Sequence, residues 1–259
     1  DAERILRYSK EHSTRFGDAA IALKLAKPAD IQQALARQFD YPYLAPGQSG
    51  VSADVVAAWS PFSRQVEALR ALRSQLLLRW FADPLERRTL AIVSPNRGDG
   101  RSFLAANLAV VFSQMGERTL LVDCDLRNPR QHELFGIKGS VGLSTLLSER
   151  AGLDAAQRVP AFVDLSVLPA GPIPPNPLEL LGRETFAKAM KDIATAFEVV
   201  ILDTPAAEIG SDFQLVSARS SGALLVARKD VSRADDCSEV ADAIKTTSAQ
   251  LVGAVLNER

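Results

Sequence analysis

The sequence predicts an α/β fold, in the form of a doubly wound and mostly parallel sheet, with a small helical module before it. The main observation is that short apolar runs rich in β-branched residues alternate with helical stretches beyond residue 84. Such runs, without polar alternation, are typical of strands buried on both faces. Strands that alternate with helices join into a parallel sheet through right-handed crossovers, which place helices on both faces.

Each expected element follows from its local pattern. Strands are predicted where β-branched runs occur, at 89–94, 119–123, 165–169, 199–203, 223–227 and 251–256. Helices are predicted between them, at 102–115, 143–148, 177–196, 211–218 and 234–247. A longer helix is predicted over 62–80, because apolar residues recur there on one side, at Val66, Leu69, Leu72, Leu76 and Leu77.

The N-terminal part has a different texture. Residues 1–44 are predicted to form the helical module, with a helix start at 27–30, where Pro28 occupies a first-turn position. Apolar residues then follow four apart, at Ile31, Leu35 and Phe39. A segment rich in turn-forming residues begins at Ala45, so 45–60 is predicted to be a linker and 61–259 the α/β domain.

Composition limits the classes of function. The chain has 259 residues, with 30 basic and 31 acidic side chains and a net charge of −1. Because this net charge gives no overall electrostatic attraction to nucleic acid, no nucleic-acid partner is expected. Two cysteines are too few for a disulfide framework or a zinc site and suit a reducing cytosol. No apolar run reaches the length of a membrane span. Because the first residue is Asp1, we expect a piece of a longer chain.

The most informative segment is SPNRGDGRS, residues 94–102, between a predicted buried strand and a helix. Gly98 and Gly100 permit a loop whose backbone N–H groups face a phosphate at the helix start, and Ser102 lies where a hydroxyl binds Mg²⁺. Pro95 and Arg101 depart from the strict G-x-x-x-x-G-K-[ST] pattern. Taken alone, the segment is also compatible with an ordinary glycine-rich turn.

Two acidic strand ends strengthen the phosphate interpretation. Asp123 and Asp125 close one apolar run and Asp203 closes another. Parallel sheets bind ligands at the carboxyl ends of their strands, and a metal bound to phosphate needs hard oxygen ligands from separate strands. Cys124 lies between two carboxylates that raise the pKa of a thiol, which argues against a reactive nucleophile.

With these motifs in place, the chain from about residue 61 onward resembles the bacterial tyrosine kinases (BY-kinases) of capsule and exopolysaccharide assembly. The resemblance rests on the loop at 94–102, DCDLRNP at 123–129, ILDTP at 201–205, and GPIPPNPLELL at 171–181. Proline is common in this family where the strict loop has its first glycine, which accounts for Pro95.

The resemblance implies ATP and Mg²⁺ as cofactors and assigns roles by position. It implies that the loop and the start of its helix bind the nucleotide, through Asn96, Arg97, Gly98, Asp99, Gly100, Arg101, Ser102 and Phe103. Asp123 and Asp125, with Arg101, are the implied catalytic residues, and the metal ligands would be Ser102, Asp123, Asp125 and Asp203. Asn257 would contact the adenine, or else end the last strand in a turn.

Two further features bear on assembly and activity. Glu67, Arg70 and Arg73 match the family's E-x-x-R-x-x-R pattern, which implies a homo-oligomer formed through this helix; the alternative is a solvated helix edge. Arg101 replaces the family's phosphate lysine, and a planar guanidinium does not fit between phosphates as a compact ammonium does, so weakened catalysis is expected. The tyrosines of this sequence, Tyr8, Tyr41 and Tyr43, all lie in the N-terminal module, so they give no basis for predicting autophosphorylation of a tail.

The N-terminal module has a resemblance of its own. Arg15-Phe16-Gly17 and the apolar spacing up to Gln38 resemble the cyclic di-GMP-binding domain of some secretion ATPases, although Lys24 replaces a glycine of that motif. Cyclic di-GMP bound at Arg15–Gln38 is therefore a possible ligand, and a module that only contacts protein is the alternative. Such a module with a BY-kinase domain resembles the EpsG-type tyrosine kinases of chain-length control.

The sequence therefore predicts an ATP-dependent protein tyrosine kinase that regulates bacterial exopolysaccharide chain length and export. The resemblance implies a membrane-embedded polysaccharide co-polymerase, or chain-length determinant, as partner. It also implies a cytoplasmic protein that is peripheral at the inner face of the inner membrane. The alternatives are a nucleotide-gated assembly switch of the MinD/ParA kind, with little kinase activity, and a non-catalytic cyclic di-GMP receptor.

Overall fold

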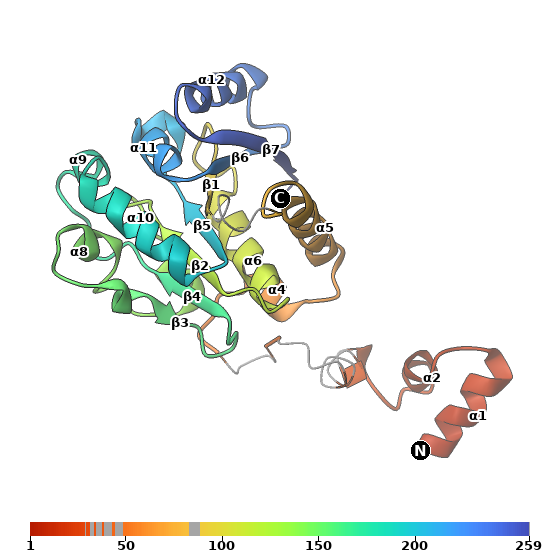
Figure 1. Ribbon diagram of the computed structural model, residues 1–259. Helices are drawn as coiled ribbons and strands as arrows, with labels where there is room; N and C mark the ends of the chain where they lie inside the picture. The colour runs from red at the N-terminus through yellow and green to blue at the C-terminus, as the bar shows by residue number, and fades with distance from the viewer. Residues whose placement is uncertain are drawn as a thin grey trace.

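In the computed structural model, a twisted sheet is covered by helices on both faces, and helices α1 and α2 lie apart from it at the N-terminal end (Figure 1). The structure describes residues 1–28, 30, 31, 34, 38, 43, 44, 49–82 and 89–258. The predicted fold class is confirmed, since the sheet is mostly parallel and wound on both sides. None of the helices in these ranges is long and apolar enough to cross a membrane.

The sheet has seven strands in the order β3-β4-β2-β5-β1-β6-β7. All neighbours pair in parallel except β3 and β4, which pair antiparallel. Their bounds are Thr89–Val93 (β1), Thr119–Asp123 (β2), Gln157–Arg158 (β3), Leu165–Leu168 (β4), Val199–Asp203 (β5), Gly222–Arg228 (β6) and Gln250–Asn257 (β7). The six predicted strands are present within two residues at each end, and β3 was not predicted, because two residues carry no periodic pattern.

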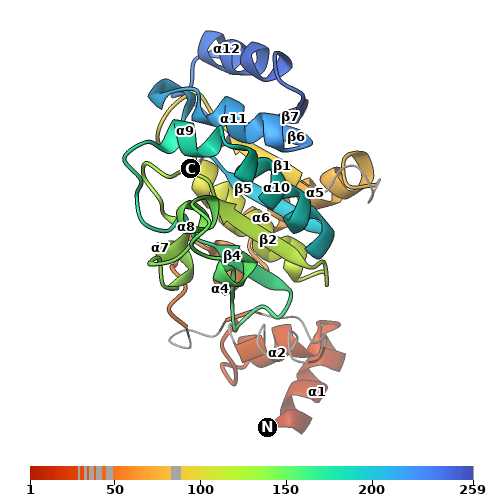
Figure 2. The ribbon, with the colours of Figure 1, turned by 60° about the vertical axis from the view of Figure 1, so that its left-hand side comes forward.

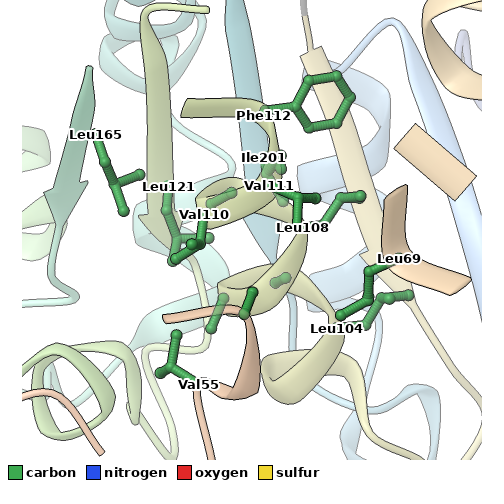
Figure 3. Close-up of a cluster of buried hydrophobic side chains, with 14 of the residues drawn as sticks. Val55, Leu69, Leu104, Leu108, Val110, Val111, Phe112, Leu121, Leu165 and Ile201 are labelled. Atoms are coloured by element: carbon green, nitrogen blue, oxygen red, sulfur yellow. The ribbon is translucent and has the colours of Figure 1, made fainter. Parts of the chain in front are cut away.

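Side chains alternate across the sheet and bury its two faces against different helices. One face packs against α4 (Val56–Trp59), α5 (Arg64–Arg79), α6 (Arg101–Ser113) and α7 (Gln131–Phe135). The labelled residues of Figure 3 belong to this face, where Leu108 and Phe112 of α6 are fully buried. Helix α6 is apolar all round, which is typical of a helix enclosed by other elements.

The second face of the sheet is covered by helices from the later part of the chain. They are α8 (Leu143–Leu147), α9 (Pro177–Leu181), α10 (Glu184–Ala196), α11 (Asp212–Arg219) and α12 (Ala234–Lys245). Two short 3-10 helices connect elements, at Leu153–Ala155 and Ala207–Ile209. The single helix predicted over 177–196 is wrong: the chain breaks at Gly182 and Arg183, which gives α9 and α10.

The linker predicted over 45–60 is not a linker in its described part, residues 49–60. Val55, Ala57 and Ala58 are fully buried in the core of the α/β domain. The side chain of Asn107, on α6, accepts a hydrogen bond from Ala57 N at 2.9 Å and donates one to the Asp54 carbonyl at 3.0 Å. The sequence could not indicate this docking, because Asn107 is the single polar residue in the apolar stretch from Phe103 to Phe112.

Helices α1 (Ala2–His12) and α2 (Phe16–Ala22) pack on each other around Ile5, Ala19 and Ala20 (Figure 2). Gly17 allows Ile31 to pack against this cluster, because a Cβ at Gly17 would lie only 2.7 Å from the Ile31 side chain. Arg15 is exposed directly before α2. Much of the predicted ligand stretch after residue 28, with Leu35 and Phe39, lies outside the described residues, so cyclic di-GMP binding stays a prediction.

Candidate active site

The loop between β1 and α6 has a backbone that only glycine adopts readily. Gly98 and Gly100 have φ angles of 79° and 104°, in the left-handed region that disfavours other residues. Asp99 is fully buried and holds the loop from within, since its carboxylate accepts hydrogen bonds from Asn96 N and Ser232 Oγ, both at 2.8 Å. Asn257, at the end of β7, donates to the Asp99 carbonyl at 2.9 Å, and a Cβ on Gly100 would clash with its amide.

The side chain of Arg101 turns back into the loop. Its guanidinium donates to the Thr204 carbonyl and to the Asn96 carbonyl, both at 2.8 Å, and also to Ser94 Oγ. Burial lowers the pKa of this arginine, although nearby carboxylates, first of all that of Asp203, act to raise it. Arg101 therefore stabilises the loop through groups of the protein itself.

The two predicted acidic strand ends meet. Asp123 and Asp203 are register partners on the adjacent strands β2 and β5, and both are fully buried. The Asp123 carboxylate accepts hydrogen bonds from the backbone N–H groups of Asp125, Arg130 and Gln131 at 2.9–3.2 Å. Both carboxylates thus face the strand end where the glycine loop leaves β1.

Gln131, the first residue of α7, connects these groups and was not predicted from the sequence. Its amide Nε2 donates to Asp203 Oδ2 at 2.7 Å and to the Ser102 carbonyl at 3.2 Å, while its backbone N–H binds Asp123. The Ser102 side chain also acts to lower the pKa of the Asp203 carboxyl group. A five-residue helix leaves too short a pattern to identify this glutamine beforehand.

Burial dominates the electrostatics of the two carboxylates. It raises the pKa of Asp203 to about 6, against the lowering effects of Gln131, Arg101 and Ser102. Burial, together with the charge of Asp203, raises the pKa of Asp123 well above its usual range. The pKa of the Cys124 thiol is also raised well above its usual value, by burial and then by Asp123, in line with the expectation that Cys124 is no nucleophile.

Asp125 accepts its hydrogen bonds through one carboxylate oxygen. Oδ1 accepts hydrogen bonds from the backbone N–H groups of Arg127 and Asn128 at 3.2 and 2.8 Å. The Arg127 side chain in turn binds both carboxylate oxygens of Asp212, at 3.0 and 3.2 Å, and Asp212 is 1% exposed. This pair fixes the segment after β2 to the start of α11.

The residues fit a metal that is bound partly by phosphate. In the described residues, no three His, Cys, Asp or Glu side chains are grouped so as to hold a metal ion alone. However, Asp203 Oδ1 and Gln131 Oε1 are buried oxygens without a hydrogen-bond partner. Unpaired buried oxygens are costly, and Mg²⁺ commonly takes only one or two carboxylates and completes its shell with phosphates and water.

The sequence profile described as "CobQ/CobB/MinD/ParA nucleotide binding domain" matches residues 90–258. The tyrosine-protein kinase YwqD of Bacillus subtilis (strain 168) is 32% identical to this chain over 209 residues, which cover 81% of this chain and 87% of YwqD. The chain belongs to the bacterial tyrosine-protein kinases. The family expected from the glycine loop and the aspartate-ended strands is thereby confirmed.

Solved structures with the same fold include a tyrosine kinase domain and a chimerical protein. The kinase domain of Escherichia coli tyrosine kinase ETK has a TM-score of 0.74 and 30% identity, covering 78% of this chain and 79% of that one. The chimerical protein CapA2B2 has a TM-score of 0.74 and 33% identity, covering 88% of this chain and 98% of that one.

An apolar cavity of about 720 Å³ lies beside the loop of this kinase. Phe103 and Asn257, both predicted to contact the nucleotide, line it together with Leu69 and Leu72 of α5. A mostly apolar cavity with an amide at its edge is the kind of site that a heteroaromatic base occupies. By contrast, the side chain of Arg97 is exposed, and only its backbone N–H is held, by Glu208 at 2.7 Å.

The predicted assembly residues of α5 fall into two groups. Glu67 and Arg70 form an ion pair on the surface, where the Glu67 side chain is 62% exposed. Arg73 instead donates to the Val111 carbonyl in the last turn of α6, at 2.8 Å. The charge of Arg73 thus finds a partner within the fold, at the negative end of a helix dipole, which leaves Glu67 and Arg70 as the candidate contacts to a second copy.

Proposed function

We propose that this chain transfers the γ-phosphoryl group of Mg·ATP to tyrosine side chains. The observation that carries the proposal is the convergence of the glycine loop, Ser102 and the register-paired Asp123 and Asp203 at one sheet edge. Phosphoryl transfer asks a protein mainly to position its reactants and to neutralise charge. The backbone N–H groups of the loop supply donors for the phosphates, and the apolar cavity beside Phe103 suits the adenine.

The metal would be held by Ser102 and Asp203, with Asp123 and Asp125 beside it. When bound, it neutralises charge on the phosphates. Asp125 is the best placed proton acceptor for the tyrosine hydroxyl, because it is 6% exposed whereas Asp123 is fully buried and holds three backbone N–H groups. The phenol oxygen forms the new bond to phosphorus, ADP leaves, and the phenol proton passes to the carboxylate.

From the family resemblance we further infer the setting of this activity. The kinase acts in exopolysaccharide assembly, regulates chain length with a membrane-embedded co-polymerase, and is held by that partner at the inner face of the inner membrane. Glu67 and Arg70 on α5 support a homo-oligomer, since they form a charged pair on one helix in which the Glu67 side chain is exposed. An ion pair of this kind contributes more to the specificity and register of an interface than to its affinity.

A nucleotide-gated assembly switch is the second candidate, and the position of Arg101 favours it. In a switch, ATP needs only to be bound, whereas in a kinase the loop cation must also stabilise the transferring phosphoryl group. The Arg101 guanidinium is already engaged by Ser94, Asn96 and Thr204. The two functions differ in whether phosphotyrosine is formed.

The test is incubation of the protein with Mg²⁺, labelled ATP and a tyrosine-containing peptide, followed by detection of phosphotyrosine. We expect the wild type to form phosphotyrosine and Asp123→Asn to lose at least 100-fold in rate. Asp192→Asn, at an exposed position on α10, is the matched control and should behave as wild type. ATP-dependent assembly in the absence of any phosphotyrosine would instead establish the switch.

A further inference from the structure

Another cavity lies on the same sheet edge as the glycine loop, beyond the end of β4. Unlike the cavity beside Phe103, it is polar. It has a volume of about 320 Å³ and is formed by the α8 region and the proline-rich segment 172–176. Two arginines also line the cavity: Arg150, which precedes the proline-rich segment in the sequence, and Arg183, which follows it. The segment belongs to the GPIPPNPLELL motif, which the nucleotide site does not use.

The walls of this cavity are held rigidly. Pro169 and Ala170 accept hydrogen bonds from the backbone N–H groups of Leu143 and Ser144, at 2.7 and 2.8 Å. Ser144 Oγ adds a third bond, to the Pro172 carbonyl at 2.7 Å. Proline rings restrict the remaining backbone, so the cavity exists before any ligand binds, and little ordering entropy is lost on binding.

The charge of the cavity is positive and not compensated. Arg150 and Arg183 form no ion pair with any residue in the described ranges, and no carboxylate lines the cavity. Two guanidinium groups match the charge of a phosphate monoester, which is about −1.5 to −2 at pH 7, and the planar fork of arginine binds phosphate oxygens in pairs. The amide of Asn176 adds a neutral donor.

The rest of the wall is apolar. Three prolines and Leu180 line it, together with Ile173, whose side chain is 64% exposed. An exposed isoleucine in a rigid loop is a surface on which a flat apolar group packs. The cavity therefore combines a site for a dianion with a wall for an aromatic ring.

We propose that this cavity binds a phosphotyrosine side chain of a protein segment that the kinase has already modified. The proposal rests on the proposed function, since that reaction makes phosphotyrosine. The cavity follows β4 and the glycine loop follows β1. In the sheet order β4-β2-β5-β1, these two strands are three inter-strand distances apart, roughly 14 Å. About four extended residues span that length, so a segment bound here presents a neighbouring tyrosine to the active site.

The test measures binding of a fluorescent peptide with one phosphotyrosine, in the presence of saturating Mg·ADP so that the glycine loop is filled. The comparison peptides carry tyrosine or phosphoserine at the same position. We expect the phosphotyrosine peptide to bind at least tenfold more tightly than either. Arg150→Gln and Arg183→Gln should each weaken it at least fivefold, while Arg219→Gln, an exposed arginine outside the cavity, should have no effect.

Absence of binding, or binding that survives both arginine substitutions together, overturns the proposal. Equal affinity for the phosphoserine peptide contradicts the assignment of the apolar wall to an aromatic ring. An unchanged thermal unfolding midpoint of the two arginine variants, measured without ATP, shows that they are folded. Because synthetic phosphotyrosine is supplied, failure of the kinase proposal and failure of this one give separate results.

Discussion

Asp203→Asn will stabilise the nucleotide-free protein at pH 7 while it lowers phosphoryl transfer at least 100-fold. Burial raises the pKa of Asp203 to about 6, above the roughly 3.9 of an unfolded chain. The folded state therefore binds the proton more tightly than the unfolded state, and stability falls as the pH rises from about 4 to 6. At pH 7 the buried charge costs on the order of 2–3 kcal/mol, since each pKa unit is about 1.4 kcal/mol.

Asparagine has nearly the same shape and no charge, so it removes that cost at pH 7. At pH 4 the wild-type carboxyl group is already protonated, and the advantage disappears. Thermal unfolding at both pH values measures this: we expect Tm to rise by roughly 5 °C or more at pH 7 and to change little at pH 4. Residues in functional sites commonly lower the stability of the folded protein in this way, because activity requires them.

Asp212→Asn is the matched control, because Asp212 is equally buried but binds Arg127 through both oxygens. The substitution leaves the Arg127 guanidinium, whose side chain is 34% exposed, without its ion-pair partner, so this variant should be less stable at pH 7. A lower Tm for Asp203→Asn at pH 7, or a gain that persists at pH 4, would contradict the explanation given for Asp203.

Arg101→Lys will raise the rate of tyrosine phosphorylation about tenfold or more. In the wild type, the guanidinium is held by the Asn96 and Thr204 carbonyls and by Ser94. A lysine cannot reproduce this fork of hydrogen bonds, and its compact ammonium group is free to follow the phosphates. A donor aimed at the transferring group contributes about 10²–10³ in rate when it is well placed, so part of that factor should be recovered.

Steady-state kinetics of the peptide substrate measure the effect, and kcat should rise more than the affinity for ATP changes. Arg118→Lys is the control, because Arg118 precedes β2 at the opposite edge of the sheet and pairs with Glu198. If Arg101→Lys forms no more phosphotyrosine than wild type while ATP still changes the assembly state, the switch is the better description of this protein.

The sequence was sufficient for six of the seven strands of the sheet and for the residues at the ends of β2 and β5. The apolar runs before Asp123 and Asp203 predicted buried strands, and parallel pairing brings the ends of both strands to one edge of the sheet. The glycine loop was recognisable because positive φ angles at Gly98 and Gly100 require a residue without a Cβ.

Contacts between distant segments were beyond such patterns. Gln131 binds Ser102 and Asp203 through its side chain, yet it lies in a helix of five residues with no detectable period. The docking of Ala57 on Asn107 joins residues fifty positions apart. Arg101 was recognised as unusual, but only the structure shows which groups hold its guanidinium.

The most direct measurement is a crystal structure of this protein with Mg²⁺ and a non-hydrolysable ATP analogue. We predict that the triphosphate accepts hydrogen bonds from the backbone N–H groups of residues 98–102, with the metal between the phosphates, Ser102 and Asp203. A sheet edge without nucleotide at saturating concentration, or Asp123 and Asp203 turned away from Ser102, would contradict the account.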